Sequence, residues 1–187
     1  MSKSTIVLIG IVVVLGLFGM TLMSSYNGLV AQQEQVNGKW SQIENMLQRR
    51  TDLIPNLVNT VKGFAAQEKS VIDSVTNARA KLAGAQGPAA KAQANGEMNS
   101  ALSRLLVVVE NYPQLKSDKT FIGLMDELSG TENRIAVARR DYNDAVQSYN
   151  TAVRTFPKSI IAGMFNFGQK EYFKAEEGAK QVPQVKF

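Results

Sequence analysis

The sequence contains no cysteine and no histidine among its 187 residues. These absences exclude a disulfide framework, a cysteine nucleophile, an imidazole general base and a metal site ligated by either residue type. They leave the redox compartment open, because a cysteine-free chain can lie on either side of a membrane. A strong excess of one charge is also missing. The formal net charge is only +5, and both signs are scattered along the chain, as on a solvated helical surface.

Long uncharged runs are absent except for one, residues 5–23, which reads TIVLIGIVVVLGLFGMTLM. At the rise of an α-helix this run covers about 28 Å, close to the hydrocarbon thickness of a bilayer. We therefore expect a flank at residues 1–4 and an uncleaved, single-pass membrane anchor at residues 5–24. A cleavable signal peptide is the alternative, but its apolar core would be shorter, and TLMSS at residues 21–25 is a poor cleavage site.

The orientation of this anchor is not fixed by the charges that flank it. Lys3 and the terminal amine stand on one side, and Lys39 is the nearest basic residue on the other. Since the positive charges are close to balance, the sequence physics leaves the side of the membrane open.

Apolar residues recur every seven positions through the first half of the chain. One series consists of Leu29, Val36, Ile43, Arg50, Leu57, Phe64 and Val71. A second series has the same period and is offset from the first by alternating steps of four and three residues; it contains Trp40, Leu47, Ile54, Val61, Val75 and Leu82. Interlocked heptads of this length are typical of a long helix packed against other helices, as in a coiled coil. We expect the polar residues within this seam, such as Arg50, to reach water or polar partners on a neighbouring helix.

Prolines and glycines predict where the helices are interrupted. We expect helix over residues 26–82 with an interruption at Pro55, either a kink or a tight turn, because proline lacks the backbone donor of a helix interior. The glycines and Pro88 of residues 84–96 predict a flexible hairpin tip. A third helix is expected over residues 97–112, where Pro113 ends it.

A last long helix is predicted over residues 119–156, about 57 Å in length, with Ser117 or Asp118 as its N-cap. Its large heptad residues are Phe121, Leu128, Ile135, Tyr142, Tyr149 and Phe156, and the companion line is Leu124, Thr131, Ala138, Ala145 and Ala152. Large residues facing small ones permit close antiparallel packing. We interpret Asn143 and Asn150, each preceded by a tyrosine, as helix–helix hydrogen-bonding residues.

These elements predict an all-α fold, in which the transmembrane helix is followed by an up-and-down four-helix bundle at residues 26–157. If both prolines merely kink their helices, the alternative is one long two-helix hairpin. An aromatic-rich return segment follows at residues 158–173. It either caps the base of the bundle, which we favour, or lies in the membrane interface, with Phe165, Phe167, Tyr172 and Phe173 as the candidate interface residues. Residues 174–187, with Pro183, are predicted to be a flexible tail.

Catalytic chemistry has few candidate residues. Arginines and carboxylates cluster on the first and last helices, and a ligand-binding module would use as its polar site Arg49, Arg50, Asp52, Glu132 and Arg139. We favour ion pairs that fix helix register, whose net contribution to stability is small. No phosphate-binding glycine loop is present, and the aromatic residues follow the heptads rather than a basic nucleic-acid surface. We predict no enzyme activity, no cofactor, no metal and no nucleic acid.

Several motifs resemble those of the LemA family. They are YNxLV at residues 26–30, WSQI at 40–43, RRxDLIPNLVxTVKGF at 49–64, Ala78-Arg79, ENYPxLK at 110–116, TENRIAVAR at 131–139 and Phe156-Pro157. The resemblance covers nearly everything after the apolar run. It implies a membrane-anchored helical bundle with no established enzyme activity and suggested roles in membrane shaping or as a scaffold. Some relatives carry a lipobox cysteine before the Tyr-Asn pair, where this chain has Ser24-Ser25.

Together, these observations predict a self-associating scaffold in the bacterial inner membrane that organises lipid or membrane-protein partners. We lean towards an extracytoplasmic domain. The alternatives are an adaptor or sensor for a membrane protease or transporter, and the ligand-binding module with the polar site named above.

Overall fold

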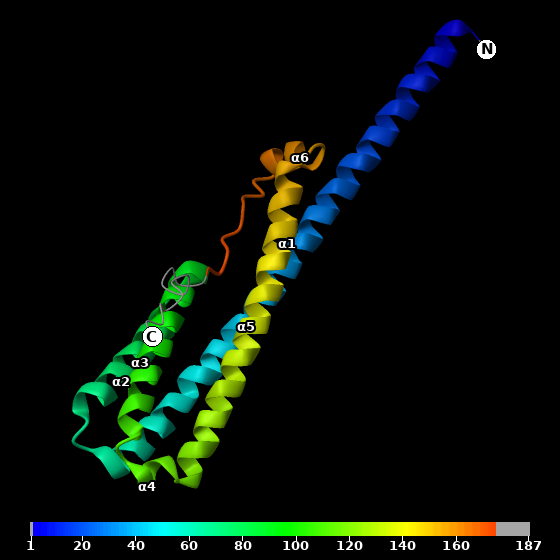
Figure 1. Ribbon diagram of the computed structural model, residues 1–187. Coiled ribbons are helices and arrows are strands. Elements are labelled where there is room, and N and C mark those ends of the chain that lie inside the picture. The colour runs from blue at the N-terminus through cyan, green and yellow to red at the C-terminus, as the bar shows by residue number, and fades with distance from the viewer. Residues whose placement is uncertain (1, 175–187) are drawn as a thin grey trace, which may run out of the picture. The chain divides into compact units, whose positions relative to one another are not determined.

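The computed structural model describes residues 2–174, and over these residues it is helical without strands. Its helices are α1 (Lys3–Ala65), α2 (Lys69–Gly84), α3 (Gly87–Val109), α4 (Pro113–Lys116), α5 (Lys119–Arg154) and α6 (Lys158–Met164) (Figure 1). The all-α prediction is therefore confirmed. The predicted tail, residues 174–187, lies outside the described residues except for Lys174.

The chain divides into two compact units. Among the described residues, the N-terminal unit consists of residues 2–38 and Asp144–Lys170. The bundle unit consists of Lys39–Asn143 and residues 171–174. Both α1 and α5 contribute residues to each unit.

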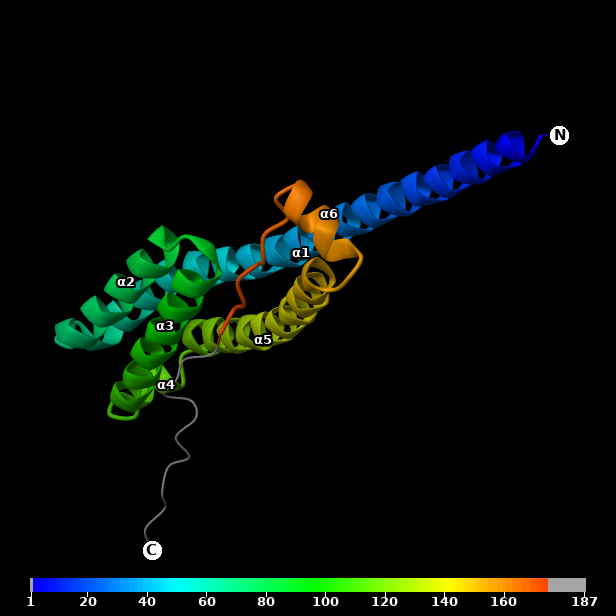
Figure 2. The ribbon, with the colours of Figure 1, turned by 90° about the horizontal axis from the view of Figure 1, so that it is seen from above.

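The bundle unit is an up-and-down bundle of four helical segments. The C-terminal part of α1, then α2, α3 and the N-terminal part of α5 alternate in direction, and the single turn α4 links α3 to α5 (Figures 1 and 2). The predicted heptads supply much of its core. Side chains that are fully or almost fully buried include Ile43, Leu47, Ile54, Leu57, Val61, Val75, Leu82, Leu128 and Ile135. The first series stops short of its predicted end, since Phe64 is 40% exposed.

Of the two alternatives expected at Pro55, the tight turn is wrong, because α1 continues through this proline to Ala65. The chain breaks instead at residues 66–68, after which α2 begins. Without a backbone N–H on Pro55, the carbonyl of Thr51 loses its helical donor. That carbonyl accepts a hydrogen bond from Nε of Arg79 on α2, at 2.8 Å. A partner on a neighbouring helix thus replaces the missing helical bond.

The long flexible loop predicted at residues 84–96 is also wrong. Only Ala85 and Gln86 separate α2 from α3, and Gly87 takes a positive φ of 77° at this turn. Pro88 lies in the first turn of α3, where its missing N–H breaks no helical hydrogen bond. The alanines and glutamine that follow favour helix. Helix α3 therefore starts ten residues before the predicted Glu97.

The predictions for the last long helix are largely confirmed. Asp118 is its N-cap, since its Oδ1 accepts a hydrogen bond from the backbone N–H of Phe121 at 2.9 Å. Helix α5 ends at Arg154, two residues earlier than predicted, and Phe156 is 77% exposed. Pro113 lies at the start of α4, so the chain is broken rather than kinked there, and the two-helix hairpin is not observed.

In the N-terminal unit, α1 carries the apolar run and then pairs with the end of α5. Leu29 and Val36 of α1 are buried, as are Val146 and Tyr149 of α5. The Tyr149 hydroxyl lies 3.3 Å from Oε1 of Gln33, to which it donates a hydrogen bond. In contrast, the apolar run is exposed: Leu8, Val14 and Phe18 each expose about 60% of their surface or more. This segment is long and apolar enough to cross a membrane.

Candidate functional site

The polar centre of the bundle unit is formed around Arg50. The heptad places this residue on the inner face of α1, where its side chain is only 3% exposed. Its guanidinium donates hydrogen bonds to the side-chain oxygen of Asn95, at 2.6 Å, and to those of Asn99 and Glu132. Burial lowers the pKa of Arg50, and the charge of Glu132 opposes this effect. The buried cation is therefore balanced by one carboxylate and two amides.

The structure brings together only part of the polar site suggested by the sequence. Arg50 and Glu132 meet as an ion pair. Arg49 instead pairs with Glu127 near the surface, and its own side chain is 55% exposed. The remaining two residues lie apart from this centre. Asp52 is exposed and accepts a hydrogen bond from Gln48, and Arg139 lies two helical turns beyond Glu132 on α5.

Asn95 and Asn99 are site residues that the sequence reasoning missed. Both lie on α3, in or beside the segment predicted to be a loop. Their four-residue spacing places them on one helix face, next to each other. In a helix over this segment, the four-residue spacing is the signal that indicates a polar pair on one face.

A shallow groove of about 300 Å³ adjoins this polar centre, between α3 and α5. Its lining residues are Arg50, Asn99, Leu102, Ser103, Leu106, Met125, Leu128, Ser129, Glu132 and Asn133. Three leucines and one methionine thus form the apolar part of the walls, and the other six lining residues are polar and include the Arg50–Glu132 pair. This arrangement suits an apolar group that carries a hydrogen-bonding end.

In the bundle unit, the first Tyr-Asn pair of α5 holds the extended chain that returns along this helix. The side-chain amide of Asn143 donates to the carbonyl of Phe173, at 3.0 Å, and accepts from its N–H, at 2.9 Å. The Tyr142 hydroxyl donates to the carbonyl of Glu171 at 2.8 Å. The ring of Phe173 is buried beside Trp40, with ring centroids 6.3 Å apart.

The second Tyr-Asn pair makes an equivalent contact in the N-terminal unit. The amide of Asn150 donates to the carbonyl of Lys170, at 2.9 Å, and accepts from its N–H, at 2.8 Å. The ammonium of Lys170 lies 5.9 Å from the centre of the Tyr149 ring, a cation–π distance. The predicted role of Asn143 and Asn150 in helix–helix hydrogen bonds is therefore wrong. Each asparagine binds the backbone of one extended residue instead.

The four candidate interface residues occupy different surroundings. In the N-terminal unit, Phe165 is 54% exposed and Phe167 is partly exposed, and both contact the ring of Tyr26. In the bundle unit, Tyr172 is 38% exposed, whereas Phe173 is 2% exposed. Phe173 thus belongs to a protein interior, and only the other three retain surface that a membrane can contact.

Comparison with known proteins gives consistent matches. A sequence model of the LemA family matches residues 39–187. Magnetosome protein MamQ 1 of Paramagnetospirillum magneticum is 33% identical, in an alignment that covers 87% of this chain and 69% of the relative. Magnetosome protein MamQ of Magnetospirillum gryphiswaldense is 31% identical over the same shares. Protein LemA of Metamycoplasma hominis is 23% identical, covering 89% of this chain and 76% of the relative.

Proposed function

The chain belongs to the LemA family, and from this premise we propose that it is a scaffold anchored in the bacterial inner membrane that self-associates there. The observation that carries the proposal is the continuity of α1. One uninterrupted helix, Lys3–Ala65, contains both an exposed run able to span a bilayer and residues of a helical bundle. Such a helix anchors in a membrane the chain that folds after the apolar run.

The proposed role is to organise lipids or membrane proteins rather than to catalyse a reaction. The polar centre at Arg50 supports this view, because its guanidinium is hydrogen-bonded within the bundle to Glu132, Asn95 and Asn99. The similarity to proteins named for the magnetosome also supports a role in a cellular structure.

Self-association is tested with the full-length protein in mild detergent and in lipid nanodiscs. Light scattering gives the mass of the particle and electron microscopy gives its shape. We expect a uniform assembly of many copies. A monodisperse monomer in both media would overturn the scaffold, and a membrane protease or transporter that copurifies with this monomer would establish the adaptor alternative.

We further propose that the bundle unit lies outside the cytoplasm. Because the chain has no cysteine, single-cysteine variants give an unambiguous labelling test. Ser103→Cys places a thiol on an exposed position of α3, and Ser2→Cys places one before the apolar run. We expect a membrane-impermeant maleimide to label Ser103→Cys in spheroplasts and to label Ser2→Cys only after lysis. The reverse pattern would place the bundle unit in the cytoplasm.

A ligand-binding function is the second candidate, supported by the groove beside Arg50 and Glu132. Its residues suit a small, mainly apolar molecule with a polar end. A fluorescent fatty acid that binds the full-length protein, and that loses affinity in Leu106→Gln at the groove wall but not in Val107→Gln next to it, would establish this function. Leu106 lines the groove and Val107 does not, although both are exposed.

A further inference from the structure

Three aromatic rings in the N-terminal unit form a cluster, which we call the aromatic collar. Tyr26 comes from α1, and Phe165 and Phe167 come from the segment that follows α6. The Phe165 and Phe167 rings meet the Tyr26 ring edge-on, with centroids 4.8 and 5.6 Å apart. Tyr26 lies three residues after Met23, the last residue of the apolar run. The collar therefore lies directly at the end of the segment able to span a bilayer, where aromatic rings are enriched in membrane proteins.

Helix α6 extends this surface. On its inner side, Ile161 and Ala162 are buried and attach the helix to the unit. Its outer side is apolar and exposed, at 53% for Ile160 and 67% for Met164. Just before the helix, Phe156 is 77% exposed. Exposed apolar side chains clustered in this way mark an interaction surface rather than ordinary protein surface.

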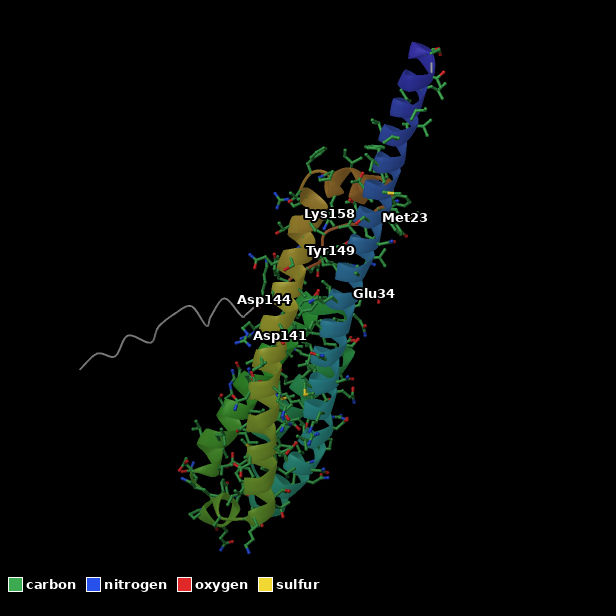
Figure 3. All side chains as sticks on the ribbon, turned by 90° about the vertical axis from the view of Figure 1, so that its right-hand side faces the viewer. Met23, Glu34, Asp141, Asp144, Tyr149 and Lys158 are labelled. Carbon is green, nitrogen blue, oxygen red and sulfur yellow. The ribbon has the colours of Figure 1, made fainter. Side chains whose placement is uncertain are left out.

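The charges around this surface are of one sign. Arg154, Lys158 and Lys170 carry the charged side chains between Asp144 and Glu171, and no carboxylate side chain occurs within that interval. The Lys158 side chain lies close to Gly28 of α1. Its Nζ is 3.8 Å from the position that a Cβ atom would occupy on this glycine. Figure 3 shows Lys158 near the Met23 end of α1, whereas Glu34 and Asp144 lie further along, away from the apolar run. Lys158 thus lies next to the exposed apolar side chains, whereas the ammonium of Lys170 lies over the Tyr149 ring.

We propose that α6 and the aromatic collar lie in the headgroup layer of the bilayer crossed by α1 and bind anionic phospholipids there. This inference rests on the membrane anchor proposed above. Aromatic and aliphatic side chains enter the boundary between headgroups and acyl chains, and the lysines and arginine contact lipid phosphates. A bilayer is favoured as the occupant over another protein because the surface is continuous with the apolar run.

The test measures depth in the membrane with spin labels on the full-length, otherwise cysteine-free chain. Single cysteines replace Met164 on the proposed surface, Val13 within the apolar run, and Asp144 as an exposed control in the same unit. The proteins are reconstituted in vesicles of phosphatidylcholine alone or of equal parts phosphatidylcholine and phosphatidylglycerol. Accessibility to oxygen, which concentrates in lipid, is compared with accessibility to a nickel chelate, which stays in water.

We expect the ratio of oxygen to nickel accessibility at Met164→Cys to be several-fold above that at Asp144→Cys and below that at Val13→Cys. Phosphatidylglycerol in the vesicles should raise the ratio at Met164→Cys further. Adding Lys158→Gln to the Met164→Cys protein should remove that increase. Equal ratios at residues 164 and 144, with a lipid-like ratio at residue 13, would overturn the inference and leave the anchor intact. A water-like ratio at residue 13 would overturn the anchor itself. Exclusion of both reagents at residue 164, with dipolar broadening between labels, would show instead that a second copy covers the surface.

Discussion

The guanidinium of Arg79 donates through Nε to the backbone carbonyl of Thr51, and the two atoms are 2.8 Å apart. Thr51 is the residue four positions before Pro55, so its carbonyl is the one that the proline leaves without a helical donor. A side chain from α2 therefore satisfies a backbone defect in α1. This contact explains how a proline is accommodated inside the part of α1 that packs in the bundle unit.

This relationship predicts that Arg79 and Pro55 are energetically coupled. Arg79→Met should lower the free energy of unfolding by about 1–3 kcal/mol, because the buried carbonyl of Thr51 loses its partner. In a Pro55→Ala background, the alanine N–H donates to the Thr51 carbonyl in place of Arg79. Arg79→Met should therefore lower the free energy of unfolding by at least about 1 kcal/mol less than it does in the wild-type background. Denaturant unfolding of the full-length protein in detergent, followed by circular dichroism, measures the cycle.

The matched control is Lys69→Met, an exposed position on the same helix. Its effect should be small and identical in both backgrounds. Additive effects of Arg79→Met and Pro55→Ala would contradict the proposed replacement of the helical bond.

The adjacent arginines 49 and 50 should differ sharply in their tolerance of substitution. Arg50→Lys retains a positive charge but loses the planar set of donors that reaches both asparagines and Glu132, so it should destabilise the protein by about 3 kcal/mol. Arg49→Lys affects only a surface ion pair and should cost about 1 kcal/mol or less. Thermal unfolding monitored by circular dichroism compares them. Equal losses would show that Arg50 is not the polar centre of the bundle.

Asn143→Asp should release the extended chain near Phe173. The carboxylate can still accept from the Phe173 N–H, but it cannot donate to the carbonyl and repels it. We expect faster amide hydrogen exchange at residues 171–174. Emission from Trp40, the sole tryptophan, should shift to longer wavelength as Phe173 leaves its ring. Gln147→Ala, on an exposed face of α5, should change neither signal. Unchanged exchange in Asn143→Asp would rule out the amide contact as the anchor.

Stability should fall at high pH through Tyr142. Burial, assisted by the negative charge of Glu171, raises the pKa of this tyrosine to about 12 in the folded protein. An unfolded tyrosine ionises at about pH 10, so the contribution is complete below that pH and is lost as the pH rises from about 10 to 12. Wild type should lose roughly 2 kcal/mol more than Tyr142→Phe across this window. The free energy of unfolding is measured against pH for both proteins by denaturant unfolding. Parallel profiles would refute the assignment of this loss of stability to Tyr142.

Two positions of the same heptad series should behave differently. Leu57 is fully buried, so Leu57→Ala should destabilise the protein by about 2–5 kcal/mol. Phe64 is 40% exposed, and Phe64→Ala should cost about 1 kcal/mol or less. Urea unfolding followed by Trp40 fluorescence provides the comparison. A larger loss at residue 64 would mean that the packed seam continues to the end of α1.

Sequence reasoning located the candidate site only in part. Arg50 is visible as a charge in an apolar heptad, and Glu132 as a carboxylate on the last helix. Asn95 was hidden because its segment combines glycine and proline with helix-forming alanines. Local signals of that kind do not reveal whether a proline begins a helix or breaks it. Similarly, Asn143 and Asn150 are recognisable as polar residues beside the seam, but their partners are backbone atoms, which have no sequence pattern.

The sequence by itself determined the helical class, the apolar run, the heptad faces and the family, because periodicity, length and motif depend on residues close together in the chain. Only the tertiary structure decided that α1 passes through Pro55, since the donor that replaces its lost hydrogen bond comes from Arg79 on another helix. The tertiary structure also decided that Phe173 is buried whereas Phe165 is exposed. Both outcomes depend on contacts between segments that are far apart in the sequence. These contacts form, and stabilise the protein, only in the folded chain.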